Sequence, residues 1–320
     1  TIKGVPTSYY KLYFDASEYE NYASMRFPDE IFIESGKKKI INIDLVIAGK
    51  IIGYITDSER TPIQAARVVL YDMNYNFVNE TLSNKDGFYV FSRLYPDNYK
   101  ILFIAEGYLK EWYNDKNSFE SGDIVSVISG VETQIEVQLN RGGIISGRVT
   151  DPNGNGISNV QVGVVEADTN FPNWYFGTTD NNGNYCVKGI PPGKYLIHFD
   201  TYHAGNYIPE WYNKKNSKLS ADKILLTEGA VYNEINATLR IGGKIEGVVK
   251  SYWGSSLPNV FLGCYDLDGD LVNSCITNSE GKFSIDKIPN GYYKLKIDPV
   301  RIGHFAIQWY EDKNFFSDAD

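Results

Sequence analysis

The sequence lacks long apolar runs, and none approaches the 18 or more residues of a membrane-spanning helix, so no membrane span is predicted. Basic residues are also few, with 31 Lys and Arg against 40 Asp and Glu. A net charge of −9 argues against nucleic acid as a partner, because no basic stripe can neutralise phosphates. The one dense basic run, at residues 37–39, is interpreted as a solvated turn.

Cysteine and histidine are scarce, at three residues each. The cysteines form no CxxC pair and share no metal-type spacing with the histidines. His198, His203 and His304 are too scattered for a metal cluster or a triad, and neither GxSxG nor HExxH occurs. We therefore predict no catalytic residue, no metal site and no cofactor.

Helical periodicity is absent from the whole chain. The 25 tyrosines, 29 glycines and many Asn and Asp residues instead accompany short segments that alternate between apolar and polar positions. This composition predicts an all-β protein.

The chain repeats itself at intervals of about one domain. Each copy opens with a strand of the type GxIxGxVxD, continues through an Asn/Asp-Gly hairpin and a proline-led turn, and closes with further strands. Gly53, Gly147 and Gly247 mark the same position in the three copies. We predict two complete repeats, at residues 48–140 and 141–240. Residues 1–47 before them hold only the last strands of a repeat, and residues 241–320 after them form a repeat that lacks its last strands.

Each complete copy holds about seven short strands separated by turn signals, as expected of a Greek-key β-sandwich. Alternation within the second strand of each copy identifies the side chains that face the core. These predicted core positions are Ala66, Val68 and Leu70; Val160, Val162 and Val164; and Val260, Leu262 and Cys264.

The repeats resemble the carboxypeptidase regulatory-like domain, a transthyretin-like (prealbumin-like) β-sandwich found in tandem in secreted and cell-surface proteins. The resemblance rests on the opening GxIxGxVxD strand, the TxxxGxY hairpin, the LPPGxY turn and the WYN segment described below. It implies an extracellular or cell-surface location and no peptidase activity, because the catalytic domain of such enzymes has another fold. Cna-B-type adhesin domains are similar, and their isopeptide bond would here require Lys50 and Asn140.

The two ends of the sequence both fall within a repeat. Residues 2–15 align without a gap to residues 187–200, and the sequence stops after QWYEDKNFFSDAD (308–320), before the strands that close the other copies. One interpretation is a window of a longer array. The other is head-to-tail assembly, in which the leading strands of one chain complete the trailing sandwich of the next.

A tryptophan-tyrosine segment occurs in every copy, as EWYNDKN (111–117), EWYNKKN (210–216) and QWYEDKN (308–314). Because it recurs with constant spacing, we predict a structural element that closes one end of the sandwich rather than a sugar-stacking site. Its aromatic residues are Trp112, Tyr113, Trp211, Tyr212, Trp309 and Tyr310. Two tryptophans that do not recur are better ligand candidates: Trp174, near Phe171 and Tyr175, and Trp253, beside Tyr252.

The stretch CYDLDGDLVNSC (264–275) raises two further questions. Its acidic centre is interpreted as a hairpin turn rather than a calcium loop, because the equivalent residues 72–76 do not share the acidic pattern. If the hairpin is symmetric about residues 269 and 270, Cys264 lies opposite Cys275, and a disulfide is predicted in an oxidising compartment. Two buried thiols, or a shifted register, remain the alternative, and Cys186 is predicted to be a lone thiol.

These patterns predict a non-enzymatic extracellular structural protein, either a rigid stalk or a filament subunit, whose partners are copies of itself or neighbouring repeats. Short junctions such as residues 140–143 favour a stiff array. The alternatives are a carbohydrate-binding or adhesin array that recognises a surface glycan, and an accessory region of a larger secreted enzyme.

Overall fold

A computed structural model describes residues 2–319 except 17, 20, 28, 300–304 and 312. The described chain is built of short β-strands, with two 3-10 turns at Lys218–Ser220 and Phe316–Asp318. The predicted all-β class is confirmed. Within the described residues no helix is long and apolar enough to cross a membrane.

The chain divides into two compact units. Unit 1 comprises residues 1–143, 188–192 and 227–230, and unit 2 comprises residues 144–187, 193–226 and 231–320. For the description that follows, residues 48–140 are called repeat A, 141–240 repeat B, 241–320 the C-terminal segment and 1–47 the N-terminal segment.

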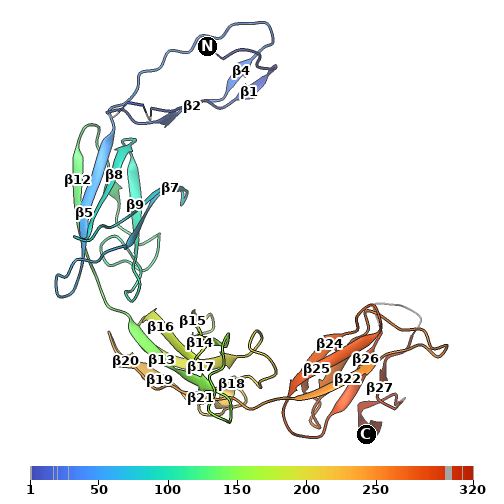
Figure 1. The fold of residues 1–320 in the computed structure, drawn as a ribbon. Coiled ribbons are helices and arrows are strands. Elements are labelled where there is room, and N and C mark those ends of the chain that lie inside the picture. The colour runs from blue at the N-terminus through green and yellow to red at the C-terminus, as the bar shows by residue number, and fades with distance from the viewer. Residues whose placement is uncertain are drawn as a thin grey trace. The chain divides into compact units, whose positions relative to one another are not determined.

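Repeat A consists of two sheets that face each other across one core (Figure 1). The first sheet has the order β12-β5-β8, and the second the order β7-β6-β9-β10, with β11 also paired to β9. The strands are β5 (Gly49–Asp57), β6 (Arg67–Asp72), β7 (Phe77–Leu82), β8 (Phe88–Leu94), β9 (Asn98–Ile104), β10 (Glu111–Trp112), β11 (Val125–Ser126) and β12 (Glu132–Leu139).

The first and last strands of repeat A run parallel to each other. β12 pairs with β5 over eight residues, from Glu132 opposite Lys50 to Leu139 opposite Asp57. Lys50 therefore lies at one end of the pair and Asn140 follows its other end. This register separates the two residues that an isopeptide bond would need, so that alternative is excluded in repeat A.

The core of repeat A follows the predicted alternation. Ala66, Val68 and Leu70 are fully buried, together with the inward residues of β5, β8, β9 and β12. Gly53 has a steric role here, since a Cβ atom at this position would lie 1.9 Å from the carbonyl oxygen of Ile135. The recurring glycine of the first strand thus allows the last strand to approach.

Repeat B has the same arrangement. One sheet has the order β16-β13-β20, with β21 also paired to β13, and the other has the order β15-β14-β17-β18, with β19 paired to β17. Val160, Val162 and Val164 are fully buried, as predicted. The strands are β13 (Gly143–Thr150), β14 (Gln161–Glu166), β15 (Trp174–Thr178), β16 (Asn184–Ile190), β17 (Gly193–Asp200), β18 (Glu210–Trp211), β19 (Ile224–Leu226), β20 (Val231–Tyr232) and β21 (Ala237–Thr238).

The C-terminal segment has one four-stranded sheet, β24-β23-β26-β27, and a two-stranded sheet, β22-β25. Its predicted core residues Val260, Leu262 and Cys264 are fully buried. Within the described residues, β22 pairs with β25 alone. The strands are β22 (Gly243–Val248), β23 (Phe261–Tyr265), β24 (Leu271–Ile276), β25 (Lys282–Ile288), β26 (Lys294–Asp298) and β27 (Gln308–Trp309).

The N-terminal segment holds two short antiparallel pairs. β1 (Ser8–Tyr10) pairs with β4 (Ile31–Ile33), and β2 (Tyr13–Phe14) pairs with β3 (Met25–Arg26). Residues 37–46 that follow are not part of any strand.

Candidate functional site

The tryptophan-tyrosine segment forms a tight hairpin. In repeat A the backbone N–H of Trp112 donates to the carbonyl of Lys116 at 2.8 Å, and the N–H of Lys116 donates back at 3.0 Å. Between them Asn114 and Asp115 both have positive φ, 69° and 58°. Asparagine is one of the few residues other than glycine that adopts this conformation readily, which explains its place in the motif.

The same asparagine also ties the hairpin to the chain that follows. The side-chain amide of Asn114 donates to Asp123 at 2.6 Å, and in repeat B Asn213 donates to Asp222 at 2.7 Å. The polar part of the motif is thus engaged inside each repeat.

The tryptophan lies on the outward face of a sheet. Trp112 stands opposite Leu102, which faces away from the core, whereas its neighbour Glu111 stands opposite the core residue Phe103. Tyr113 packs at the edge of the core. The prediction that Trp and Tyr together close one end of the sandwich is therefore wrong for the tryptophan, because the two-residue strand β10 continues the sheet and directs Trp112 outward.

A phenylalanine covers this tryptophan in repeat A. The ring of Phe119 meets Trp112 edge-on with centroids 5.3 Å apart, and Trp112 is only 6% exposed. The Lys100 ammonium lies 4.7 Å from the Phe119 ring centroid and donates to the carbonyls of residues 119 and 120.

The C-terminal segment repeats this cover. Phe316 meets Trp309 at 5.2 Å, and Lys294 lies 4.7 Å from the Phe316 ring centroid and donates to its carbonyl. The adjacent Tyr310 is more than half exposed.

Repeat B differs from repeat A and the C-terminal segment at the positions of both the covering phenylalanine and the lysine beside it. Lys218, which is exposed, stands where repeat A has Phe119, and the buried Leu196 stands where repeat A has Lys100. Trp211 is half-buried and contacts the ring of His198 at 4.7 Å and that of Trp174 at 6.4 Å. Tyr212 is half-buried as well.

The outward face of repeat B is hollowed beside these rings. The hollow has a volume of about 320 Å³ and is lined by Gln161, Gly163, Trp174, Phe176, His198 and Asp200. Strand register brings these residues together: Gly163 stands between Phe176 and His198, and Gln161 stands opposite Asp200. One wall is aromatic, because the rings of Trp174 and Phe176 are stacked in parallel, with centroids 5.7 Å apart and an interplanar angle of 6°.

Two lining groups have defined polar environments. Asp200 accepts the backbone N–H of Tyr202 at 2.8 Å through one carboxylate oxygen. Burial lowers the pKa of His198 below its usual 6.5, although the nearby Asp200 opposes this, so the imidazole is neutral at pH 7. Asp200 supplies the carboxylate of the lining.

The structure separates the two ligand candidates. Trp174 lines the hollow, but its partner there is Phe176 and not Phe171 or Tyr175; Tyr175 turns to the other face and meets Tyr195. Trp253 is 84% exposed in a loop and contacts only the ring of Tyr252 among the aromatic pairs described.

The expected pairing of Cys264 with Cys275 is not what the register shows. Cys275 stands opposite Leu262, and Cys264 opposite Asn273, so the two thiols are diagonal neighbours and are both free. Diagonal neighbours lie about 7–8 Å apart, with their Cβ atoms somewhat closer but still beyond the roughly 3.5–4.5 Å that a disulfide requires. The cause is a turn centred on residue 268 together with a bulge after Cys264, which shifts the predicted register by two residues.

The acidic turn itself is engaged internally, as predicted. The Asp266 carboxylate accepts the backbone N–H groups of Asp268 and Asp270 at 3.1 and 2.8 Å. No group of three or more potential metal ligands occurs within the described residues. Cys186 is an exposed thiol on β16.

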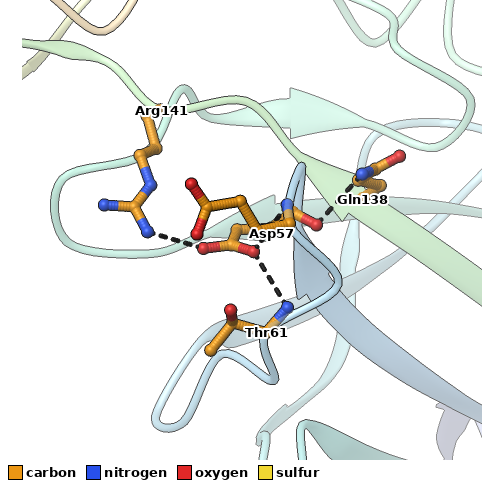
Figure 2. Close-up of polar contacts among 5 residues, drawn as sticks. Asp57, Thr61, Gln138 and Arg141 are labelled. Atoms are coloured by element: carbon orange, nitrogen blue, oxygen red, sulfur yellow. Dashed lines mark hydrogen bonds and ion pairs between the residues drawn. The ribbon is translucent and has the colours of Figure 1, made fainter.

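A polar cluster in repeat A joins the first strand to the connector (Figure 2). The buried Asp57 accepts the backbone N–H of Thr61 at 2.9 Å and the Arg141 guanidinium at 2.7 Å, while Gln138 donates to its carbonyl oxygen. The hydrogen bond from Arg141, followed by that from the Thr61 N–H, lowers the pKa of the Asp57 carboxyl. The last residue of the GxIxGxVxD motif is thus a fastening point for the connector.

Sequence reasoning identified Trp174 and the recurring tryptophans, but missed the residues that distinguish repeat B. The signal was available in the alignment of the repeats, where Phe119 and Phe316 correspond to Lys218 and where Lys100 and Lys294 correspond to Leu196. Recognising its meaning requires knowing that these positions share one face of a sheet.

Comparison with known proteins places the fold in context. The chain is 24% identical over 270 residues to Colossin-A of Dictyostelium discoideum, covering 75% of this chain and 2% of that protein. It is 22% identical over 281 residues to serine-aspartate repeat-containing protein F of Staphylococcus epidermidis, covering 76% of this chain and 17% of that protein. The chain thus spans a small part of the length of these relatives.

A solved structure, GBS52, the minor pilin of Streptococcus agalactiae, matches with 12% identity over 61% of this chain and 96% of that chain. Its TM-score of 0.31 is too low to support an argument. The sequence pattern of one family, by contrast, matches residues 50–140 and again 144–222, more than half of the chain. The chain belongs to the carboxypeptidase regulatory-like domain family.

Proposed function

We propose that this chain is part of an extracellular, non-enzymatic surface protein in which tandem β-sandwiches act as a stiff structural spacer. The observation that carries the proposal is the way in which each connector is fastened to the repeat before it. Similarity to long proteins, one of which is named for its repeats, supports the same function.

The first connector is held along its length. The backbone N–H of Leu109 donates to the carbonyl of Asn140 at 2.9 Å, and that of Gly142 donates to Gly107 at 3.0 Å. Arg141 lies between them and forms the ion pair with Asp57. Three successive connector residues therefore have fixed partners within unit 1, and little freedom remains for bending.

The second connector is fastened in the same manner within unit 2. Ile208 donates to Arg240 at 2.9 Å and Gly242 donates to Asn206 at 2.8 Å through their backbone groups. The Asn206 side chain adds two bonds, since its amide donates to the Gly242 carbonyl at 2.7 Å and its oxygen accepts the Lys287 N–H at 2.6 Å.

Small-angle X-ray scattering of the full chain tests the spacer. Inserting three Gly-Gly-Ser units between Arg141 and Gly142 should broaden the pair-distance distribution, because the fastened connector becomes a flexible one. The same insertion at the exposed tip between β6 and β7 is the control and should leave the distribution nearly unchanged. If the connector insertion scatters like wild type, the spacer is already flexible and the proposal fails.

We propose further that the open edge of β22 is completed head-to-tail by a second copy. In repeat A the corresponding β5 has a strand on each side, and its inward Ile51 and Ile55 are fully buried. The equivalent Ile245 and Val249 in the C-terminal segment are only partly buried. An apolar strand in parallel register would cover them.

The N-terminal segment carries a strand of the required type. Ile41, Ile43 and Leu45 precede Gly53 with the same spacing by which Ile135, Val137 and Leu139 precede Gly147. Residues 37–46 are not paired in a strand here, which is consistent with a donor role.

Light scattering after size-exclusion chromatography, over a hundredfold range of concentration, should show association that a synthetic peptide of residues 37–47 inhibits. The same peptide with Ile43→Asp places a charge toward the core and should not inhibit. A chain that stays monomeric throughout and does not bind the peptide would rule out strand exchange while leaving the spacer proposal intact.

A further inference from the structure

The outward face of repeat B differs from the corresponding face of repeat A and of the C-terminal segment. Phe119 in repeat A and Phe316 in the C-terminal segment cover the hairpin tryptophan, which is 6% exposed in repeat A and half-buried in the C-terminal segment. Repeat B has Lys218 at that position, and its tryptophan borders a hollow. A structural element needs no such hollow, so the difference requires another explanation.

From this comparison we infer that the hollow of repeat B is a binding site for an uncharged pyranose sugar, with Trp174 and Phe176 as its stacking platform. This inference goes beyond the proposed spacer function and does not depend on it, because it concerns the surface of one repeat.

The platform has the shape that a sugar ring requires. Trp174 and Phe176 are 39% and 55% exposed, their rings are parallel, and both residues line the hollow. Such a surface can receive the C–H face of a pyranose, as aromatic rings commonly pack against flat apolar groups. Trp174 itself rests above Gly163, where a Cβ atom would come within 2.8 Å of the indole. Glycine at this position therefore sets the depth of the hollow.

Polar groups stand where hydroxyls would project. Gln161 and Asp200 are direct neighbours across β14 and β17 at one edge of the hollow, and His198 lies beside Gly163. A carboxylate, an amide and an imidazole can together accept from and donate to sugar hydroxyls. An apolar lining with a few convergent polar groups is the usual composition of a small-molecule site.

Charge selects among sugars. Neither Lys nor Arg is among the lining residues, and Asp200 contributes a carboxylate. An acidic sugar would be repelled at close range, whereas a neutral hexose can donate its hydroxyl hydrogens to the carboxylate. The lining therefore favours neutral hexoses over uronic or sialic acids.

Affinity gel electrophoresis of the full chain tests the site with four soluble polysaccharides: hydroxyethylcellulose, yeast α-mannan, guar galactomannan and, as the acidic probe, hyaluronan. At least one neutral polymer should retard the wild-type chain, and hyaluronan should not. Trp174→Ala should weaken the binding about tenfold or more, as expected for a central aromatic anchor. Trp253→Ala removes a more exposed tryptophan outside the hollow and should have no effect.

Two further variants separate binding from folding. Gly163→Ala keeps every lining side chain but displaces the indole, and Asp200→Asn keeps the shape but removes the charge; both should weaken binding while leaving the melting curve close to wild type. The proposal is overturned if no neutral polymer retards the wild-type chain, if hyaluronan binds as well, or if Trp174→Ala binds unchanged. It is also overturned if Trp174→Ala instead abolishes self-association, which would make the face a protein interface.

Discussion

Glu111 provides the sharpest test of how the tryptophan hairpin is built. Its side chain points toward the core, because it stands opposite Phe103, and it is buried. Burial, with a smaller contribution from the neighbouring charge of Asp115, raises the pKa of this carboxyl from its usual 4.5 to about 7. The folded state thus favours the protonated form, and ionisation above that pH opposes folding.

The perturbation is Glu111→Gln, which keeps the shape and removes the charge. A pKa raised on folding means that the carboxyl destabilises the native state progressively as pH rises from about 4.5 to about 7. The full shift would correspond to at most roughly 3 kcal/mol, and screening by nearby solvent reduces the expected effect to about 1–2 kcal/mol. The variant should therefore match wild type at pH 4 and exceed it by about 1–2 kcal/mol at pH 8.

Hydrogen exchange followed by mass spectrometry measures this locally in the intact chain. Peptides that cover β9 and β10 should exchange more slowly in the variant at pH 8, after correction for intrinsic rates, and equally at lower pH. Glu136→Gln, on the exposed face of β12, is the matched control and should change little at either pH.

The chain contains a natural comparison for the same position. Gln308 stands where repeat A has Glu111, so the C-terminal segment already carries the neutral side chain. In repeat B burial also raises the pKa of Glu210, while Arg240 and Lys214 oppose the shift, so Glu210→Gln should gain less. If Glu111→Gln were less stable than wild type at pH 8, the ionised carboxylate would be stabilising and the reasoning would be refuted.

Three other outcomes follow from the described contacts. Trp112→Ala should lower the free energy of unfolding of repeat A by about 3–4 kcal/mol, whereas Trp211→Ala removes a half-buried ring and should lower that of repeat B by about 1–2 kcal/mol. Equal losses of stability in the two repeats, measured by hydrogen exchange, would contradict the difference in burial of the two tryptophans. The denatured, unreduced chain should titrate three free thiols with a disulfide reagent, and a single thiol would restore the predicted bridge. Asp57→Asn should lower the free energy of unfolding of repeat A at neutral pH and make it depend less on pH in acid. The reason is that Arg141 lowers the pKa of the Asp57 carboxyl, which therefore stabilises the fold above about pH 4 and loses this effect as the pH falls through its folded pKa. Acid denaturation that is the same in the variant and the wild type would contradict the ion pair.

The fold could be predicted because its determinants are local. Alternation along β6, β14 and β23 identified inward side chains such as Val68, Val162 and Leu262, and all are buried. The recurring Gly53 and Gly147 marked the strand against which the end of the repeat packs, since Gly53 lies against the carbonyl of Ile135 in β12 and Gly147 against that of Ile235, between β20 and β21. Such features need only the period of a strand and the steric demand of a turn.

The wrong predictions concern features that a shift of one or two residues in strand register or facing reverses. The disulfide depended on hairpin register, and a bulge after Cys264 displaced Cys275 to a position opposite Leu262. Similarly, a short strand after a loop has no period long enough to reveal its face, so the outward direction of Trp112 could not be read from the sequence. Sequence symmetry is a poor guide to register wherever a bulge can occur.

The candidate site was hidden for a different reason, because its residues come from three strands. Gly163, Trp174 and His198 are separated by up to 35 positions, and only the pairing of β14 with β15 and β17 joins them. Repetition nevertheless supplies an internal control that a single domain lacks. Features that all copies share, such as the hairpin and its outward tryptophan, are explained by the fold itself. Repeat B lacks the ring that Phe119 provides in repeat A. A position that differs in one copy while the fold is kept is one where selection for binding can act without loss of stability.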